Sequence, residues 1–125
     1  MPILCIGETI IERKSKIFKD VLKKQINECV PDNQKKIIIA YEPLWSIGTG
    51  VIPKITEIEE VSNLIKGHIS ERFSNLDFKI VYGGSVDQNN INEIVNITNI
   101  DGSLVGGASL DSIVFLELIR NVNFN

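Results

Sequence analysis

One acidic residue stands where a strand, a stiff turn and a glycine-flanked segment meet. Residues 36–41 form a largely apolar run that predicts a buried strand, and Glu42 follows at its end. Pro43 restricts its own backbone and biases Glu42 toward an extended conformation. Residues 46–50, here called the lid segment, read Ser-Ile-Gly-Thr-Gly. This arrangement suits a general base at a rigid strand end beneath a closing loop, although a surface glutamate in an ordinary loop would give the same local pattern.

Small residues follow apolar runs at three other places. These runs end in Gly7-Glu8, in Gly83-Gly84-Ser85 and in Gly106-Gly107. Glycine lets backbone N–H groups approach an anion closely, and a helix N-terminus adds a favourable dipole. One such pair alone indicates an ordinary tight turn. Two pairs after successive strands, with the Glu42 loop before them, indicate a phosphate site beside the acid.

Four βα units must position these residues. Apolar patterns predict strands at residues 3–6, 36–42, 79–82 and 102–105, and helices at 16–29 and 90–96. A capping-box signature at Thr56 and Glu59 predicts the start of another helix, and Asp111 is expected to cap the last one. The order βαβαβαβα predicts a parallel sheet with right-handed crossovers. No linker divides residues 1–125, and the outer two strands would be open edges that invite pairing.

The four motifs closely resemble those of triosephosphate isomerase. They stand in that family's order and spacing, at residues 5–9 with Glu12 and Arg13, at 40–50, at 82–86 and at 101–110. The resemblance spans nearly the whole chain but covers only about the second half of the family's domain. A complete barrel of this kind needs about 250 residues. With 125 residues, the chain is expected to form half of a TIM (β/α)8 barrel, an α/β domain of four βα units with parallel strands.

The resemblance implies an enzyme of glycolysis and gluconeogenesis that interconverts dihydroxyacetone phosphate and glyceraldehyde 3-phosphate through an enediolate. It makes Glu42 the catalytic base and assigns the substrate phosphate to Gly48, Ser85, Gly106 and Gly107. The lid and its supports would be Glu8, Pro43, Trp45, Ile47, Thr49, Tyr82 and Leu104. Leu104 would keep water from the base, Glu8 and Trp45 would hydrogen-bond when the lid moves, and Glu12 and Arg13 would form an ion pair. No cofactor or metal is expected, and no Cys/His metal spacing exists.

Departures from the family limit what the chain is expected to do alone. The family's Asn-x-Lys, its electrophilic histidine and the loop that forms its homodimer lie in the first half and have no counterpart here. The sole histidine, His68, is expected on a helix surface. The chain would therefore need a separately encoded N-terminal half for activity. Alternatives are an inactive remnant, a non-catalytic phosphate-binding half-barrel, or another phosphate-binding barrel, which would lack the Tyr-Glu-Pro-Leu-Trp lid.

Pro53 is a second departure. In the family, a backbone N–H at about this position can latch the closed lid to the tyrosine that matches Tyr82. Proline has no N–H. We therefore expect weaker latching or a different hinge in this chain.

The charge and composition of the chain limit the classes of partner that it is expected to bind. The net charge is −3, which gives no electrostatic footprint for nucleic acid. With 43% hydrophobic and 23% charged residues, the chain is ordinary for a soluble globular protein. No cationic apolar leader and no membrane-length apolar run is present. We expect a cytoplasmic protein whose two cysteines are reduced and whose ligand is a small phosphorylated triose.

Overall fold

The computed structural model describes residues 1–122 and contains one parallel sheet of four strands. Strands β1 (Ile3–Ile6), β2 (Lys36–Tyr41), β3 (Asp77–Tyr82) and β4 (Gly102–Ser103) lie in the sheet in chain order. The helices are α1 (Ile10–Lys14), α2 (Phe18–Cys29), α3 (Ile55–Arg72), α4 (Ile91–Val95) and α5 (Ser112–Arg120), with a 3₁₀ turn η1 (Gly107–Ser109). The sequence prediction of four βα units with parallel strands, half of a TIM barrel, is confirmed.

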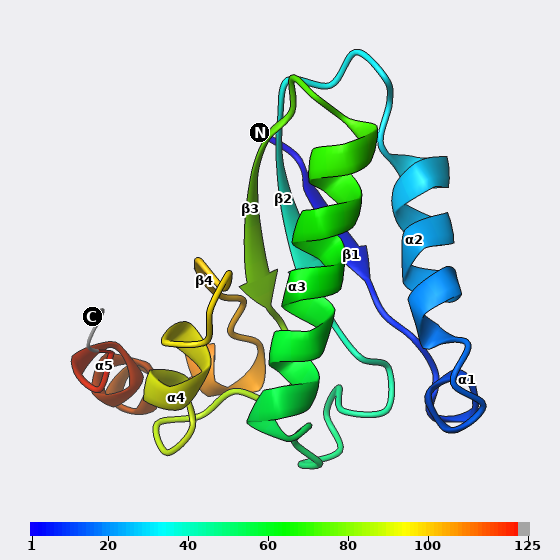
Figure 1. Cartoon of the computed structure of the whole chain (residues 1–125). Helices are drawn as coiled ribbons and strands as arrows, with labels where there is room; N and C mark the ends of the chain where they lie inside the picture. The colour runs from blue at the N-terminus through cyan, green and yellow to red at the C-terminus, as the bar shows by residue number, and fades with distance from the viewer. Residues whose placement is uncertain (123–125) are drawn as a thin grey trace.

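Helices α2 and α3 cover one face of the sheet, and Figure 1 shows them side by side against it. Alternate side chains of the strands point into this layer and form the main core with the apolar faces of the two helices. Its fully buried members include Leu22, Ile26, Ile39, Tyr41, Ile58, Ile65, Ile69 and Tyr82. This core fixes the registers of β2 and β3, whose ends carry the site.

The opposite face of the sheet has no such cover in residues 1–122. Ile3 and Cys5 on β1 are exposed, and Ile38 on β2 and Val81 on β3 are only half-buried. Apolar parallel strands are normally buried on both faces. This face therefore has the character of a barrel interior that lacks its opposite wall.

A smaller core joins α4 to α5. Leu118 of α5 packs with Ile91 and Val95 of α4. Figure 1 shows these helices beside β4, and Ile94 of α4 also belongs to the main core. Leu116 and Ile119 of α5 are about half exposed.

Several local expectations also needed correction. Helix α2 begins at Phe18 because Lys16 has a positive φ of 61°, and α1 was not expected. Helix α3 begins two residues earlier than predicted, with Lys54 as its N-cap, whose backbone N–H donates to the Glu57 carboxylate at 2.8 Å. Strand β4 ends at Ser103 rather than at residue 105. The predicted cap of α5 is confirmed, since the Asp111 carboxylate accepts hydrogen bonds from two backbone N–H groups of the first turn.

Within residues 1–122, no helix combines the length and the apolar character that crossing a membrane would require.

Candidate active site

Glu42 lies one residue beyond β2, and the neighbouring strands hold its backbone. The Glu42 N–H donates to the Ile6 carbonyl at 2.8 Å, and the Gly83 N–H donates to the Tyr41 carbonyl at 2.9 Å. The parallel ladder thus continues past the strand end. Pro43 is buried behind Glu42, and its carbonyl accepts from the Ser46 N–H at 2.9 Å. Glu42 therefore projects from a rigid support, as a positioned base requires.

Glu42 fits between its neighbours because positions 7 and 83 are glycines without a Cβ. A Cβ at Gly7 would lie 1.9 Å from the Glu42 carbonyl oxygen, so β1 can approach only through glycine. A Cβ at Gly83 would lie 2.7 Å from both Cγ and Oε1 of Glu42. Gly7 thus admits the backbone of the acid, and Gly83 admits its carboxylate.

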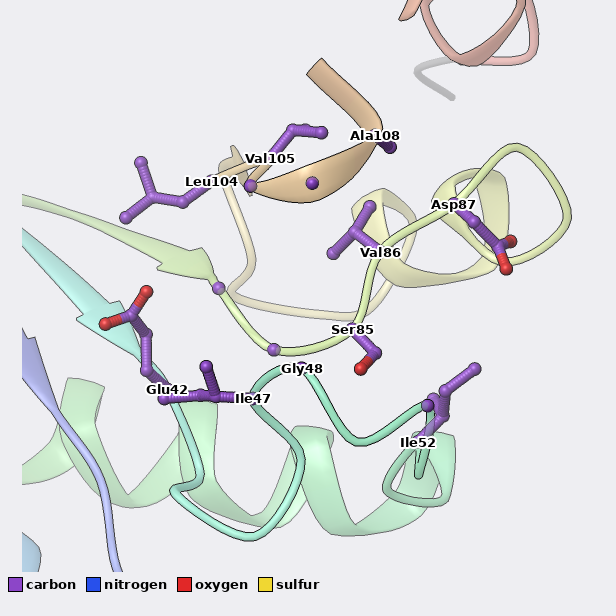
Figure 2. A pocket seen from close by; sticks show the side chains of 15 residues that line it. Glu42, Ile47, Gly48, Ile52, Ser85, Val86, Asp87, Leu104, Val105 and Ala108 are labelled. Carbon is purple, nitrogen blue, oxygen red and sulfur yellow. The ribbon is translucent and has the colours of Figure 1, made fainter. Parts of the chain in front are cut away.

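The carboxylate faces a cavity of about 730 Å³ at the carboxyl ends of the strands. Figure 2 shows Glu42 at one side of this cavity, with Leu104 and Val105 above it and the lid segment below. The lining residues are Glu42, Ile47, Gly48, Gly50, Ile52, residues 83–87 and residues 104–108. The cavity therefore brings together Glu42 and all four residues predicted to bind phosphate, Gly48, Ser85, Gly106 and Gly107. Ile47 and Leu104 add apolar walls.

Backbone geometry shapes the tip of the lid segment. Gly48 and Gly50 have positive φ angles of 65° and 73°, which glycine adopts without strain. Between them, the Thr49 hydroxyl donates to the Trp45 carbonyl at 3.1 Å and accepts from the Val51 N–H at 3.1 Å. Thr49 thus braces the lid from within and does not line the cavity.

Glu8 anchors the start of the lid segment to β2. Its side chain is fully buried, and one oxygen accepts both from the Tyr41 hydroxyl at 3.0 Å and from the Trp45 indole at 3.1 Å. Arg13 completes the group with an Nε 3.7 Å from the same oxygen. Burial, more than the Glu8 charge, raises the pKa of Tyr41, so this phenol stays a donor. Glu8 therefore ties the strand that carries Glu42 to the hinge of the lid.

The expected Glu12–Arg13 ion pair does not form. Glu12 accepts hydrogen bonds from the N–H and the hydroxyl of Thr9, which closes the capping box of α1. Arg13 pairs instead with Glu8 and with Glu57, each at 3.7 Å. Its guanidinium also lies 4.1 Å from the centre of the Phe18 ring. Arg13 therefore joins β1, α2 and α3 beneath the site.

Cys5 is the titratable group most directly affected by Glu42. Partial burial raises the pKa of its thiol, and a hydrogen bond to Glu42 and the charge of that carboxylate raise it further. Cys5 and Glu42 also line a smaller cavity of about 180 Å³ at the end of β1, together with Gly7 and Gln25 of α2. The thiol is thus a donor toward the acid and not a nucleophile.

Charges in the main cavity are unbalanced. Its lining includes the carboxylates of Glu42 and Asp87 but no Lys, Arg or His from residues 1–122. Over the same residues, no cluster of three or more His, Cys, Asp or Glu side chains could hold a metal ion. An anion bound here would depend on backbone N–H groups and the Ser85 hydroxyl.

Comparison with known proteins agrees with this geometry. The family model described as Triosephosphate isomerase matches residues 1–122. The chain belongs to the triosephosphate isomerase family. It is 41% identical over 122 residues to a triosephosphate isomerase of Rhizobium meliloti (strain 1021), covering 94% of this chain and 48% of that protein. With the one of Borreliella burgdorferi (strain ZS7) it shares 44% over 127 residues, covering 96% and 50%.

A solved structure extends the match to three dimensions. The triosephosphate isomerase of Bartonella henselae superposes with a TM-score of 0.84 at 36% identity. The alignment covers 95% of this chain and 48% of the Bartonella chain. The chain thus spans about half the length of the triosephosphate isomerases that it matches, in agreement with its four strands.

Several residues that shape this triosephosphate isomerase-type site were not singled out from the sequence. Tyr41 and Gly7 were seen only as parts of motifs, and Ser46 only as the first residue of the lid segment. Gly83 was read as a possible amide donor, although its missing side chain is what admits Glu42. The signal for such roles is a small residue at a strand end, which by itself does not reveal the close contact.

Proposed function

We propose that this chain supplies the base and the phosphate-binding half of a triosephosphate isomerase. In this reaction Glu42 removes a proton from one carbon of the triose and returns it to the adjacent carbon, through an enediolate. The observation that carries the proposal is the single cavity that holds the Glu42 carboxylate together with Gly48, Ser85, Gly106 and Gly107. A positioned base typically contributes about 10²–10⁴ in rate.

Each part of the cavity has a task in this mechanism. The amides of Gly48, Gly106 and Gly107 bind the phosphate and so place the reacting carbons near Glu42. The Ser85 hydroxyl joins them by rotating away from the Ser46 carbonyl, to which it donates at 2.7 Å in this structure. Ile47 and Leu104 exclude water from the base, which limits loss of the abstracted proton to solvent. The support of Glu8 and Trp45 orients the lid segment over the substrate.

Full activity requires a partner for the open sheet. The cavity has no cation among its lining residues, so nothing in it polarises the substrate carbonyl or offsets the charge of the enediolate. Removing one preorganised donor of this kind typically costs about 10²–10³ in rate. We therefore propose that an N-terminal half-barrel completes the site, and that the chain without it turns over little substrate.

The test is isomerisation by a completed barrel. Residues 1–122 are fused to the half of the Rhizobium meliloti relative that this chain does not match, and triose-phosphate interconversion is compared with that of the chain alone. We expect turnover in the fusion, and a loss of at least 10²-fold in Glu42→Gln. Glu93→Gln, the same change on the exposed surface of α4, is the matched control and retains activity. A folded fusion without turnover contradicts the proposal.

The open edges of the sheet favour a second candidate, a non-catalytic half-barrel that binds phosphate metabolites. That candidate predicts phosphate binding by the chain and no turnover even when the barrel is complete. Turnover by the folded fusion separates the two candidates. Inorganic phosphate titrated into the fusion then shows whether the Glu42→Gln loss is catalytic, because this variant removes turnover but not phosphate binding if Glu42 is the base.

A further inference from the structure

Ser46 is one of few buried polar side chains in residues 1–122, and its contacts join three segments. The side chain is fully buried. Its Oγ lies 2.6 Å from the Val51 carbonyl oxygen, 3.2 Å from the Tyr82 hydroxyl and 3.3 Å from the Ser85 N–H nitrogen. The Ser85 hydroxyl in turn donates to the Ser46 carbonyl at 2.7 Å. One residue thus connects both ends of the lid segment, the end of β3 and the phosphate-binding loop.

The hydrogens in this group can be assigned by counting donors. A serine hydroxyl has one hydrogen and can accept two hydrogen bonds. The Val51 carbonyl can only accept, so the single hydrogen of Ser46 points to Val51. Ser46 must then accept from both the Ser85 N–H and the Tyr82 hydroxyl. All three contacts are satisfied at once by this arrangement.

Tyr82 is able to serve as that donor. Burial raises the pKa of its hydroxyl, and the charge of Glu8 raises it further. The phenol is therefore protonated at neutral pH. Pro53, which is buried at the far end of the lid, offers it no N–H. The latch in this chain thus runs from Tyr82 to the hydroxyl of Ser46.

Gly84 makes room for the junction. A Cβ at this position would lie 2.1 Å from the Tyr82 hydroxyl oxygen and 2.9 Å from the Ser46 Oγ. Because the nearer contact is with a tyrosine packed in the core, a side chain at position 84 would force the two hydroxyls apart. The Gly83-Gly84 pair therefore has two separate tasks, space for the Glu42 carboxylate and space for the Ser46 junction.

We propose that Ser46 is a positioning residue that couples closure of the lid segment to the order of the phosphate-binding loop at Ser85. This proposal rests on the proposed function, in which the lid segment and the Ser85 loop both act on a bound triose phosphate. Ser46 does not line the cavity and acts through Ser85 and through Val51. Loosening the junction should release the lid and the Ser85 loop together.

The first experiment needs no turnover. Amide hydrogen exchange is measured for the lid segment and for residues 83–87, in the full chain and in the completed barrel. Ser46→Ala removes the three hydrogen bonds of the Ser46 Oγ. It should speed exchange in both segments about 5- to 10-fold, as expected for the loss of about one buried hydrogen bond in each segment. Ser62→Ala is the matched control, since Ser62 is equally buried but donates to the Glu59 and Thr98 carbonyls on α3 and near α4. It should change neither segment.

The second experiment separates positioning from a general loss of structure. In the completed barrel, Ser46→Ala should lower kcat/KM for glyceraldehyde 3-phosphate about 10-fold and leave that for unphosphorylated glyceraldehyde unchanged, since only the phosphate engages the Ser85 loop. Equal losses for both substrates would overturn the proposal. So would faster exchange in the lid segment alone, or no protection of the Ser85 amide in the unaltered chain.

Should Ser46→Ala fail to fold, Tyr82→Phe tests the same junction. It keeps the aromatic ring in the core and removes only the hydroxyl that donates to Ser46. Faster exchange in both segments is the expected result, and unchanged exchange in the lid segment contradicts the assignment of the hydrogens. If the exchange results hold while the completed barrel has no activity, the junction stands and the proposed function fails.

Discussion

Replacing Gly83 with alanine should disable the base while leaving the fold intact. The added Cβ would lie 2.7 Å from Cγ and Oε1 of Glu42, whereas ordinary contact begins at 3.4 Å. The carboxylate must therefore shift by at least 0.7 Å, the difference between these two distances. A misplacement of about 1 Å can cost about 10²-fold in rate. We expect kcat of the completed barrel to fall about 10- to 100-fold, with the loss in Glu42→Gln as its upper bound.

Alanine substitutions at Gly83 and at Gly7, which both lie against Glu42, should affect stability very differently. The atoms that obstruct a Cβ at Gly83 belong to a side chain that can rotate, so the midpoint of thermal unfolding should change little. At Gly7, the obstructing atom is the Glu42 carbonyl oxygen at 1.9 Å, which is fixed in the strand ladder. Gly7→Ala should therefore destabilise the chain by about 2–3 kcal/mol or more, in the upper range of overpacking.

Gly102→Ala is the matched control for this experiment, since its Cβ would meet only Val81 Cγ1 at an ordinary 3.8 Å. Initial rates of isomerisation and thermal melting are measured for all three variants in the completed barrel. The reasoning is refuted if Gly83→Ala keeps more than half of kcat, or if it loses as much stability as Gly7→Ala.

Three further predictions concern the chain itself. Gly67→Ala should stabilise it by about 0.5–1 kcal/mol in urea unfolding, because this position is inside α3 and nothing lies within 4 Å of an added Cβ. Asp111→Ala should cost about 1 kcal/mol in the same assay through loss of the N-cap, and an unchanged midpoint would contradict the cap geometry. In a Cys29→Ser background, the pH midpoint for alkylation of Cys5 should lie above pH 9, the ordinary pKa of the thiol. Glu42→Gln should lower that midpoint. An unchanged midpoint would contradict the contact between the Cys5 thiol and the Glu42 carboxylate.

The fold could be predicted because its signals are local and repeated. Short apolar runs such as residues 36–41 predict buried strands, and a glycine or a proline lies within two residues after each run. Boundaries were less accurate where tertiary contacts decide them. Lys54 replaced Thr56 at the start of α3 because the carboxylate of Glu57 reaches the Lys54 N–H at 2.8 Å, a contact that propensity alone does not reveal.

The buried face of α5 could not be predicted from its sequence. Its sequence is apolar on several sides, so helical spacing alone does not select an inner stripe. In the structure Leu118 packs against α4, while Ile113, Leu116 and Ile119 are exposed. The choice depends on which elements surround the helix, and a half-barrel offers fewer of them.

Some residues of the candidate site could be predicted from their positions in the sequence, and others only from contacts in the structure. Glu42 and the glycine pairs lie at strand ends, and the carboxyl ends of parallel strands meet at one edge of a sheet, so their meeting in one cavity follows from order alone. The junction at Ser46 depends on contacts of its hydroxyl with the Tyr82 hydroxyl and the Ser85 N–H, 36 and 39 residues away in the chain, which no sequence pattern encodes.

The charge of the cavity explains why binding and catalysis need not survive together in this chain. A triose phosphate brings negative charge next to Glu42 and Asp87, and no basic side chain of residues 1–122 lines the cavity. Backbone N–H groups can hold a phosphate by close approach, so some affinity for inorganic phosphate can remain without a cation. Proton transfer needs a further group, because the negative charge of the enediolate develops away from the phosphate that these amides bind. Under the proposed function, the cation that stabilises this intermediate comes from the half-barrel that closes the open face of the sheet.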